Sequence, residues 1–200
     1  MLDLAHLQKI YPNGANALQD VSLSIDAGEI VALVGGSGCG KTTLLRLVSG
    51  LERPSSGTVS VDGEAISAPH PAVGIVFQEA RLLPWLSVAE NIAFGLDHLP
   101  AAERRDLVEE ALLKVGLAGY GGRWPRELSG GQAQRVSIVR ALVTKPKVLL
   151  MDEPFSALDA LTRGSLQDHL LALWEAHRPT LVLVTHDVEE AAVLADRAVV

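Results

Sequence analysis

The most informative segment of the sequence is Gly35-Gly36-Ser37-Gly38-Cys39-Gly40-Lys41-Thr42. It directly follows the apolar run Ile30–Val34 and precedes residues 43–49, which have helical character. Glycines at this spacing let successive backbone N–H groups and a helix N-terminus converge on phosphate oxygens, and Lys41 adds a mobile positive charge. A glycine-rich turn without a ligand is the alternative, but a chance match in 200 residues is on the order of one per cent. The stretch therefore predicts a phosphate-binding loop between a strand and a helix.

Two adjacent carboxylates follow another apolar run, at residues 148–151. Asp152 and Glu153 would lie at the carboxyl end of a strand, where open α/β sheets bind their ligands. Such a pair on its own is more often a solvated feature or a helix entry. Because a phosphate-binding loop precedes it, we expect Asp152 and Thr42 to hold Mg²⁺. We expect Glu153 to orient or deprotonate the attacking water.

Short apolar runs alternate with amphipathic stretches, which predicts an α/β fold with a mostly parallel sheet. Continuous apolar runs that indicate buried strands lie at residues 30–34, 73–77, 148–151 and 181–185. Residues 21–25 and 58–61 alternate apolar and polar side chains, which predicts a small antiparallel β layer. Residues 87–145 read as an inserted helical subdomain. We expect one domain over residues 1–200. Gly164 predicts a kink in the helix expected around it. Residues 197–200 look like the start of a strand, so we expect a C-terminal portion to be missing.

Composition limits the classes of function. The 17 Lys and Arg residues against 24 Asp and Glu residues give a net charge of −7, which argues against a large nucleic-acid footprint. Cys39 is the only cysteine, which excludes an internal disulfide framework. The apolar runs are shorter than the roughly 18 to 20 residues of a membrane-spanning helix, and residues 1–6 lack the pattern of a secretory signal. We therefore expect a cytoplasmic chain.

Leu128-Ser129-Gly130-Gly131-Gln132, followed by Gln134-Arg135 and Arg140-Ala141-Leu142, resembles the signature sequence of ATP-binding-cassette (ABC) ATPases. Ser129 is placed to cap the helix that follows, and the two glycines leave its first N–H groups open to an anion. The resemblance implies ATP with Mg²⁺, held by a head-to-tail dimer of two copies. The residues implied for ATP binding are Tyr11, Gly35, Gly36, Ser37, Gly38, Cys39, Gly40, Lys41, Thr42 and Thr43. The signature residues implied to contact ATP on the partner copy are Leu128, Ser129, Gly130, Gly131 and Gln132.

The remaining motifs of the family occur along this sequence in the same order as in the family. Tyr11 resembles the aromatic residue that stacks on adenine. Gln78 is similar to the Q-loop glutamine that contacts Mg²⁺ and the γ-phosphate. Ser156, Ala157, Leu158 and Asp159 resemble the D-loop at the dimer interface. His186 resembles the switch histidine, which implies a catalytic role together with Glu153 and Gln78.

Residues 77–85 and 91–96 resemble the nitrate, sulfonate, taurine and bicarbonate importer branch of the family. The resemblance implies transmembrane permease subunits, an extracytoplasmic solute-binding protein and a position on the cytoplasmic face of the plasma membrane. It also implies a surface for the membrane subunit at Arg81, Leu82, Leu83, Pro84 and Trp85. The alternative is that the apolar residues Leu82, Leu83, Pro84, Trp85 and Leu86 cap the core of the helical subdomain.

Two other functions fit part of the sequence. A soluble cassette protein that acts on DNA or ribosomes usually carries a long coiled-coil insertion or two cassettes in tandem, and this sequence has neither. A small-molecule kinase would use the phosphate-binding loop but leaves residues 128–132 unexplained. We therefore expect the ATP-hydrolysing subunit of a transporter.

Overall fold

The computed structural model describes residues 1–36, 38–156 and 158–200. The chain groups into two compact units. The first consists of Met1–Ile75, Pro146–Glu153 and Arg178–Val200, and the second of Val76–Lys145 and Pro154–His177. Among the described residues, no helix has both the length and the apolar character needed to cross a bilayer.

The larger sheet has five strands in the order β6 (Val73–Val76), β7 (Val148–Asp152), β8 (Thr180–Thr185), β3 (Ile30–Val34) and β9 (Arg197–Val199). β8 pairs in parallel with both β7 and β3, and β3 pairs in parallel with β9. β3 and β8 consist mostly of Val, Ile and Leu because both faces of a parallel sheet are covered. The four predicted core strands are confirmed to within one residue at each end, as is the strand that opens near residue 197.

The smaller sheet is antiparallel, with the order β2 (Asn16–Ile25), β1 (Leu2–Ile10), β4 (Ser56–Val61) and β5 (Glu64–Ala65). The two predicted alternating segments lie in β2 and β4. β1 was not predicted, because its alternation of buried and exposed residues is interrupted. Its register with β2 shifts between Leu4 and Leu7, where His6 adopts a φ of 51°. Such a bulge inserts an extra residue, so a period of two cannot be followed along the strand.

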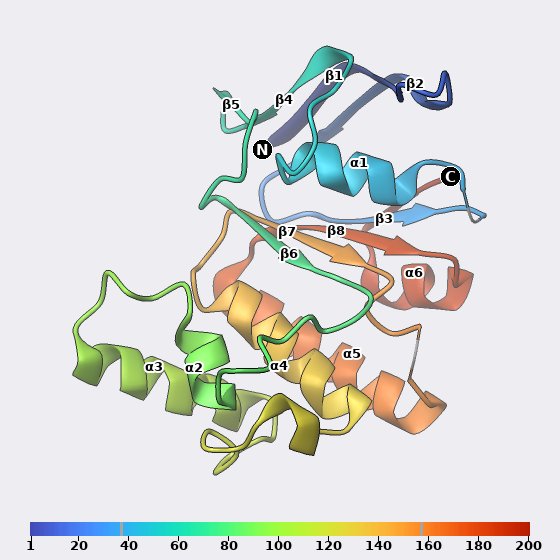
Figure 1. Cartoon of the computed structure of the whole chain (residues 1–200). Helices are drawn as coiled ribbons and strands as arrows, with labels where there is room; N and C mark the ends of the chain where they lie inside the picture. The colour runs from blue at the N-terminus through green and yellow to red at the C-terminus, as the bar shows by residue number, and fades with distance from the viewer. Residues whose placement is uncertain (37, 157) are drawn as a thin grey trace. The chain divides into compact units, whose positions relative to one another are not determined.

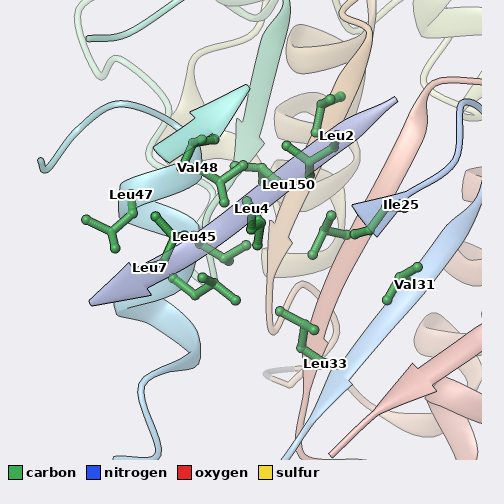
Figure 2. Close-up of a cluster of buried hydrophobic side chains, with 14 of the residues drawn as sticks. Leu2, Leu4, Leu7, Ile25, Val31, Leu33, Leu45, Leu47, Val48 and Leu150 are labelled. Carbon is green, nitrogen blue, oxygen red and sulfur yellow. The ribbon is translucent and has the colours of Figure 1, made fainter. Parts of the chain in front are cut away.

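Helix α1 (Lys41–Val48) lies between the two sheets of the first unit (Figure 1). Leu45 belongs to one buried cluster with Leu7 of β1 and with Val31 and Leu150 of the parallel sheet (Figure 2). Each such side chain stabilises the fold by about 1.5–3 kcal/mol when fully buried. α6 (Val188–Leu194) packs against β3 and β8 from the other side (Figure 1). The phosphate-binding loop is therefore carried between a buried strand and a buried helix.

The second unit contains α2 (Val88–Ala93), α3 (Ala101–Lys114), a 3₁₀ turn η1 (Pro125–Glu127), α4 (Gly130–Leu142) and α5 (Ala160–His177). α2, α3 and α5 each contact α4. Four of these elements lie within the predicted helical stretch, and α5 joins them from later in the sequence. α5 continues through Gly164 without interruption, and nothing would meet a Cβ there within 4 Å. An α-helix tolerates a glycine at a cost of about 1 kcal/mol relative to alanine, so the helix runs on past Gly164, and a kink there stays a prediction.

Candidate functional site

Strand register in the first unit brings three predicted segments to one edge of the parallel sheet. β3 and β8 pair Val34 with Thr185, and β7 and β8 pair Asp152 with Val184. The phosphate-binding loop, Glu153 and His186 therefore follow neighbouring strands at their carboxyl ends. This edge is where open α/β sheets bind ligands.

The first turn of α1 has no side-chain cap among the described residues. Its N-cap residue is Gly40, with a φ of 100°, in the left-handed region. A Cβ at this position would lie 2.5 Å from the carbonyl oxygen of Ala17, so only glycine fits. The first turn also lacks an acidic residue. Its backbone N–H groups, together with the positive end of the helix dipole, form an anion site.

Lys41 lies along the phosphate-binding loop. Its Nζ donates hydrogen bonds to the carbonyl oxygens of Gly35 at 2.6 Å and Gly36 at 2.8 Å, and lies 3.6 Å from the Sγ of Cys39. These bonds keep the ammonium group beside the open helix end, where it can reach a bound phosphate. The predicted ligand Ser37 lies outside the described residues, whereas Gly36 and Gly38 are described and exposed.

Thr42 and Asp152 bring two oxygen ligands together. The Oγ1 of Thr42 donates a hydrogen bond to Oδ1 of Asp152 at 3.3 Å. Burial raises the pKa of Asp152 and the charge of Glu153 adds to this, while the bond from Thr42 acts in the opposite direction. A hydroxyl and a carboxylate are the hard oxygen donors that Mg²⁺ takes, so the donor set fits this cation.

Glu153 and His186 lie in direct contact. The Nδ1 of His186 is 3.1 Å from Oε2 of Glu153. Glu153 adopts a φ of 44°, and its N–H donates to the carbonyl oxygen of Val184 at 2.9 Å. A non-glycine residue in the left-handed region costs on the order of 1–3 kcal/mol, and such strain is concentrated at functional sites. The carboxylate and the imidazole can together orient a water molecule and hold its proton.

Tyr11 is attached to α1 through its hydroxyl group. Its Oη donates to Oε2 of Glu52 at 3.1 Å and lies 3.4 Å from Oγ1 of Thr43. Burial tends to raise the pKa of Glu52, but hydrogen bonds from Tyr11, Arg46 and Lys9 outweigh it and lower the pKa. The aromatic ring is thus held beside the helix that begins at the phosphate-binding loop. Sequence analysis did not single out Glu52, because its partners are distant in sequence.

The signature residues lie in the second unit, at the start of α4. The Oγ of Ser129 accepts the N–H of Gln132 at 3.3 Å, and Oε1 of Gln132 accepts the N–H of Ser129 at 2.9 Å. This reciprocal capping box confirms the predicted cap. A Cβ on Gly131 would lie 2.6 Å from Cγ2 of Thr162, whereas Gly130 has nothing within 4 Å. Leu128 precedes the cap in an extended conformation.

Gln78 and the D-loop also belong to the second unit. The Nε2 of Gln78 donates to Oγ of Ser156 at 3.2 Å. Asp159 accepts the N–H of Thr162 at 3.1 Å and its hydroxyl at 2.6 Å, which lowers the pKa of Asp159. Leu158 donates its N–H to the carbonyl oxygen of Phe155 at 3.2 Å. Ala157 lies outside the described residues.

Two polar side chains, the half-buried Arg140 and the buried Asn91, hold the segment that follows Gln78. Arg140 donates to the carbonyl oxygens of Ala80 at 3.1 Å and Arg81 at 3.0 Å. Asn91, with 0% exposure, accepts the N–H of Leu83 at 2.7 Å and donates to three carbonyl oxygens of residues 83, 86 and 87. Sequence analysis did not assign these roles, since a polar residue in a helix gives no sign that it will be buried.

A groove of about 980 Å³ lies in the second unit, lined by residues of α2, α3 and the segment after α3. Trp85 lines it and is 68% exposed, and Phe94 on the same wall is 61% exposed. Trp85 is therefore not a core residue. Of the other four predicted contact residues, none is among those that line the groove, and the guanidinium of Arg81 lies 4.1 Å from the ring centre of Phe77.

The fold and this edge of the sheet define a P-loop nucleotide-binding domain. The ABC transporter family model matches residues 18–156. The aliphatic sulfonates import ATP-binding protein SsuB 1 of Xanthomonas axonopodis pv. citri is 52% identical, over 92% of this chain and 74% of that protein. The bicarbonate transport ATP-binding protein CmpC of Synechococcus elongatus is 50% identical over 97% of this chain, which spans only 30% of that protein. The nitrate import ATP-binding protein NrtD of the same organism is 49% identical, over 92% of this chain and 68% of that protein.

Solved structures agree with this class. The ATP-binding cassette MJ0796, in a dimeric structure bound to ADP and Pi, has a TM-score of 0.88 and 34% identity, covering 100% of this chain and 93% of that one. CbiO1 of Clostridium perfringens has a TM-score of 0.89 and 32% identity, and the match covers 98% of this chain and 82% of that one. The chain belongs to the ABC transporter family, and its relatives near 50% identity are ATP-binding proteins of bicarbonate, nitrate and sulfonate transport. The predicted family and branch are thereby confirmed.

Proposed function

We propose that this chain is the ATP-hydrolysing subunit of an ABC transporter that imports a small anion or organic solute. The observation that carries the proposal is the sheet edge in the first unit. There the open end of α1, the Thr42–Asp152 pair and the Glu153–His186 pair follow strands that are neighbours. These are the groups that phosphoryl transfer to water requires: a phosphate cradle, metal ligands and a positioned base.

Each group has a separate part in hydrolysis. The open N–H groups of α1 and the ammonium of Lys41 bind the phosphates of ATP. Thr42 and Asp152 would hold Mg²⁺, which would neutralise negative charge on the phosphates of ATP. The contact of Gln78, in the second unit, with Mg²⁺ stays a prediction from the sequence. Glu153 orients the attacking water and accepts its proton, and His186 holds the carboxylate in place.

The other predicted site residues complete the ATP site. Tyr11 offers its ring to adenine, and Gly35, Gly36, Ser37, Gly38, Cys39, Gly40 and Thr43 complete the nucleotide-binding segment. Leu128, Ser129, Gly130, Gly131 and Gln132 contact the γ-phosphate of ATP bound to a second copy, and Ser156, Ala157, Leu158 and Asp159 lie at the dimer interface. The dimeric structure of the similar cassette MJ0796 supports a dimer, and its head-to-tail arrangement is part of our proposal.

The groove in the second unit is proposed as the place where a permease subunit docks, with a helix of that subunit between α2 and α3. Exposed aromatic side chains in an apolar groove fit the apolar face of a helix, and aromatic anchors commonly dominate such interfaces. Two of the relatives are import ATP-binding proteins, which supports an importer. Such an importer would act with an extracytoplasmic solute-binding protein from the cytoplasmic face of the membrane. Of the coupling residues predicted from the sequence, Trp85 supplies the contact surface and Arg81, Leu82, Leu83 and Pro84 shape the adjoining loop.

Replacement of Glu153 with Gln tests hydrolysis. The variant should bind ATP as the wild type does but hydrolyse it about 10²–10⁴-fold more slowly, because the amide cannot take the proton of water. ATP should then accumulate in a stable dimer, measured by light scattering with Mg²⁺. Glu64→Gln, an exposed charge change of the same kind, is the control and should leave the rate unchanged. If Glu153→Gln hydrolyses ATP at the wild-type rate, Glu153 is not the base.

Replacement of Trp85 with Ala tests the groove. The variant should lose about 2 kcal/mol or more of binding to its permease subunits, as a buried aromatic anchor does. Its melting temperature and basal hydrolysis should stay unchanged, since Trp85 is exposed. Trp124→Ala, at 41% exposure outside the groove, is the matched control. Equal assembly of both variants with the permease subunits would refute docking at the groove. A chain that assembles with no membrane protein would favour a soluble ABC ATPase.

A further inference from the structure

Glu190 is a buried acidic residue that the proposed mechanism does not use. It lies on α6 of the first unit and is 4% exposed. Acidic side chains are almost never fully buried unless they are paired. One of its hydrogen bonds is short: the hydroxyl of Thr185 donates to Oε2 of Glu190 at 2.6 Å. Thr185 is the last residue of β8 and directly precedes His186.

The same hydroxyl group joins both sides of the turn that contains His186. The N–H of Asp187 donates to Oγ1 of Thr185 at 3.0 Å, and Oδ1 of Asp187 accepts the N–H groups of Glu189 at 2.9 Å and Glu190 at 3.4 Å. A closed ring of hydrogen bonds thus runs from Thr185 to Asp187 and Glu190 and back to Thr185. His186 is the one residue of the turn that lies between the strand end and the helix cap.

The chemistry of the partners sets the direction of each bond. A carboxylate only accepts, so the hydroxyl of Thr185 gives its single hydrogen to Glu190. The lone pairs of that oxygen then remain for the N–H of Asp187. Loss of the hydroxyl would break both bonds and free the N–H of the peptide group between His186 and Asp187.

We infer that Thr185 and Glu190 are positioning residues, which hold His186 in contact with Glu153. The inference rests on the proposed function, in which this contact at 3.1 Å orients the base. Neither residue touches the reacting atoms. They act by limiting the backbone angles of the turn, so that the imidazole remains within hydrogen-bond distance of the carboxylate.

Hydrolysis by a Thr185→Val variant tests the inference, because valine keeps the shape and removes the hydroxyl. The value of kcat should fall about 10-fold while KM for ATP changes less than about twofold, since the positioning affects the chemical step and not phosphate binding. Thr185→Ser restores the hydroxyl and should recover most of kcat. A Thr185→Val enzyme with wild-type kcat would overturn the proposal.

Thr180 provides a matched control at the other end of the same strand. It is 2% exposed, its hydroxyl accepts the N–H of Gly28 at 3.2 Å and donates to the carbonyl oxygen of Asp26 at 3.1 Å. Thr180→Val should therefore lower the melting temperature as Thr185→Val does, but leave kcat within about twofold. An equal loss of kcat in both variants would show a general structural effect and would overturn the proposal.

The ring nitrogens of His186 give a measurement that does not depend on hydrolysis. Their ¹⁵N chemical shifts, assigned by comparison with a His186→Ala spectrum, should change in Thr185→Val and Glu190→Gln and stay unchanged in Thr180→Val. If the wild type does not hydrolyse ATP but the shifts change in this pattern, the proposed function fails and the positioning stands. Unchanged shifts in Thr185→Val in an active enzyme would reject the positioning alone.

Discussion

Helices α1 and α4 both begin at a glycine-rich turn, but their first turns are completed in different ways. At α1 the N-cap residue is Gly40 and no side chain among the described residues caps the turn. At α4 the hydroxyl of Ser129 and the amide of Gln132 form a reciprocal capping box. Helix α1 thus leaves its first backbone N–H groups open beside Lys41, whereas the capping box of α4 already binds part of its own.

This difference predicts that the two helix ends bind phosphate in different ways. The open end of α1, with the ammonium of Lys41 beside it, can hold a phosphate without help from another chain. The first turn of α4 has no basic side chain, and two of its backbone groups are used by the capping box. It can contribute to an anion site whose main contacts come from elsewhere. We therefore expect α1 to supply affinity and α4 to respond to ATP that a partner already holds.

The largest effect is expected at the open end. Replacement of Lys41 with Ala should weaken ATP binding by about 100-fold or more, because charge-assisted hydrogen bonds to phosphate contribute roughly 1.5–3 kcal/mol each. Calorimetric titration measures the change. Lys147→Ala removes an exposed charge that is paired with Asp62 in the same unit, and it should leave the affinity for ATP unchanged. Similar affinity in both variants would mean that α1 is not the phosphate site.

An intermediate effect is expected when two inactive variants are mixed. A Lys41→Ala subunit and a Ser129→Arg subunit should each fail alone, but together they form a dimer with one complete site, which takes its phosphate-binding loop and its signature from different chains. Hydrolysis by purified heterodimers measures this recovery.

The control for the mixing experiment is a Lys41→Ala subunit paired with a Glu153→Gln subunit. Both of these changes affect the α1 edge, so each site in the dimer keeps one defect and activity should not return. If hydrolysis recovers in both mixtures, or in neither, an ATP site does not combine the α1 end of one chain with the α4 end of the other.

The smallest effect is expected at the cap. Ser129→Ala should cost about 1 kcal/mol of folding free energy, which lowers the melting temperature by about 2–4 °C in a chain of this size. Ser87→Ala removes the same kind of capping box from α2 and should cost about as much. Only Ser129→Ala should also slow hydrolysis. If hydrolysis falls equally in both variants, the cap of α4 has no special relation to ATP.

Sequence reasoning succeeded where the signal is local. The strands at residues 30–34, 148–151 and 181–185 were predicted because a strand covered on both faces is a continuous apolar run. The Ser129 cap was predicted because its partner lies only three residues away. β1 was missed because the bulge at His6 breaks the period that marks a half-buried strand.

Contacts between distant residues could not be predicted in the same way. Arg140 binds carbonyl oxygens 59 and 60 residues earlier, and Glu52 receives the hydroxyl of Tyr11 from 41 residues away. Their residue types are common on surfaces, and no neighbour in sequence reveals that they will be half-buried. Trp85 was left open between core and surface, and its exposure decides for the surface.

Local sequence was sufficient to predict the strand, glycine loop and helix of the phosphate-binding segment, and the acidic pair at the end of a strand. These features depend on backbone angles and hydrogen bonds within a few residues. The folded unit was needed to show that Val34 pairs with Thr185 and Asp152 with Val184, which places the loop, Glu153 and His186 at one edge. It also decided that Glu190 is buried beneath that edge. Strand register follows from the burial of apolar side chains contributed by the whole unit, so no local stretch of sequence contains it.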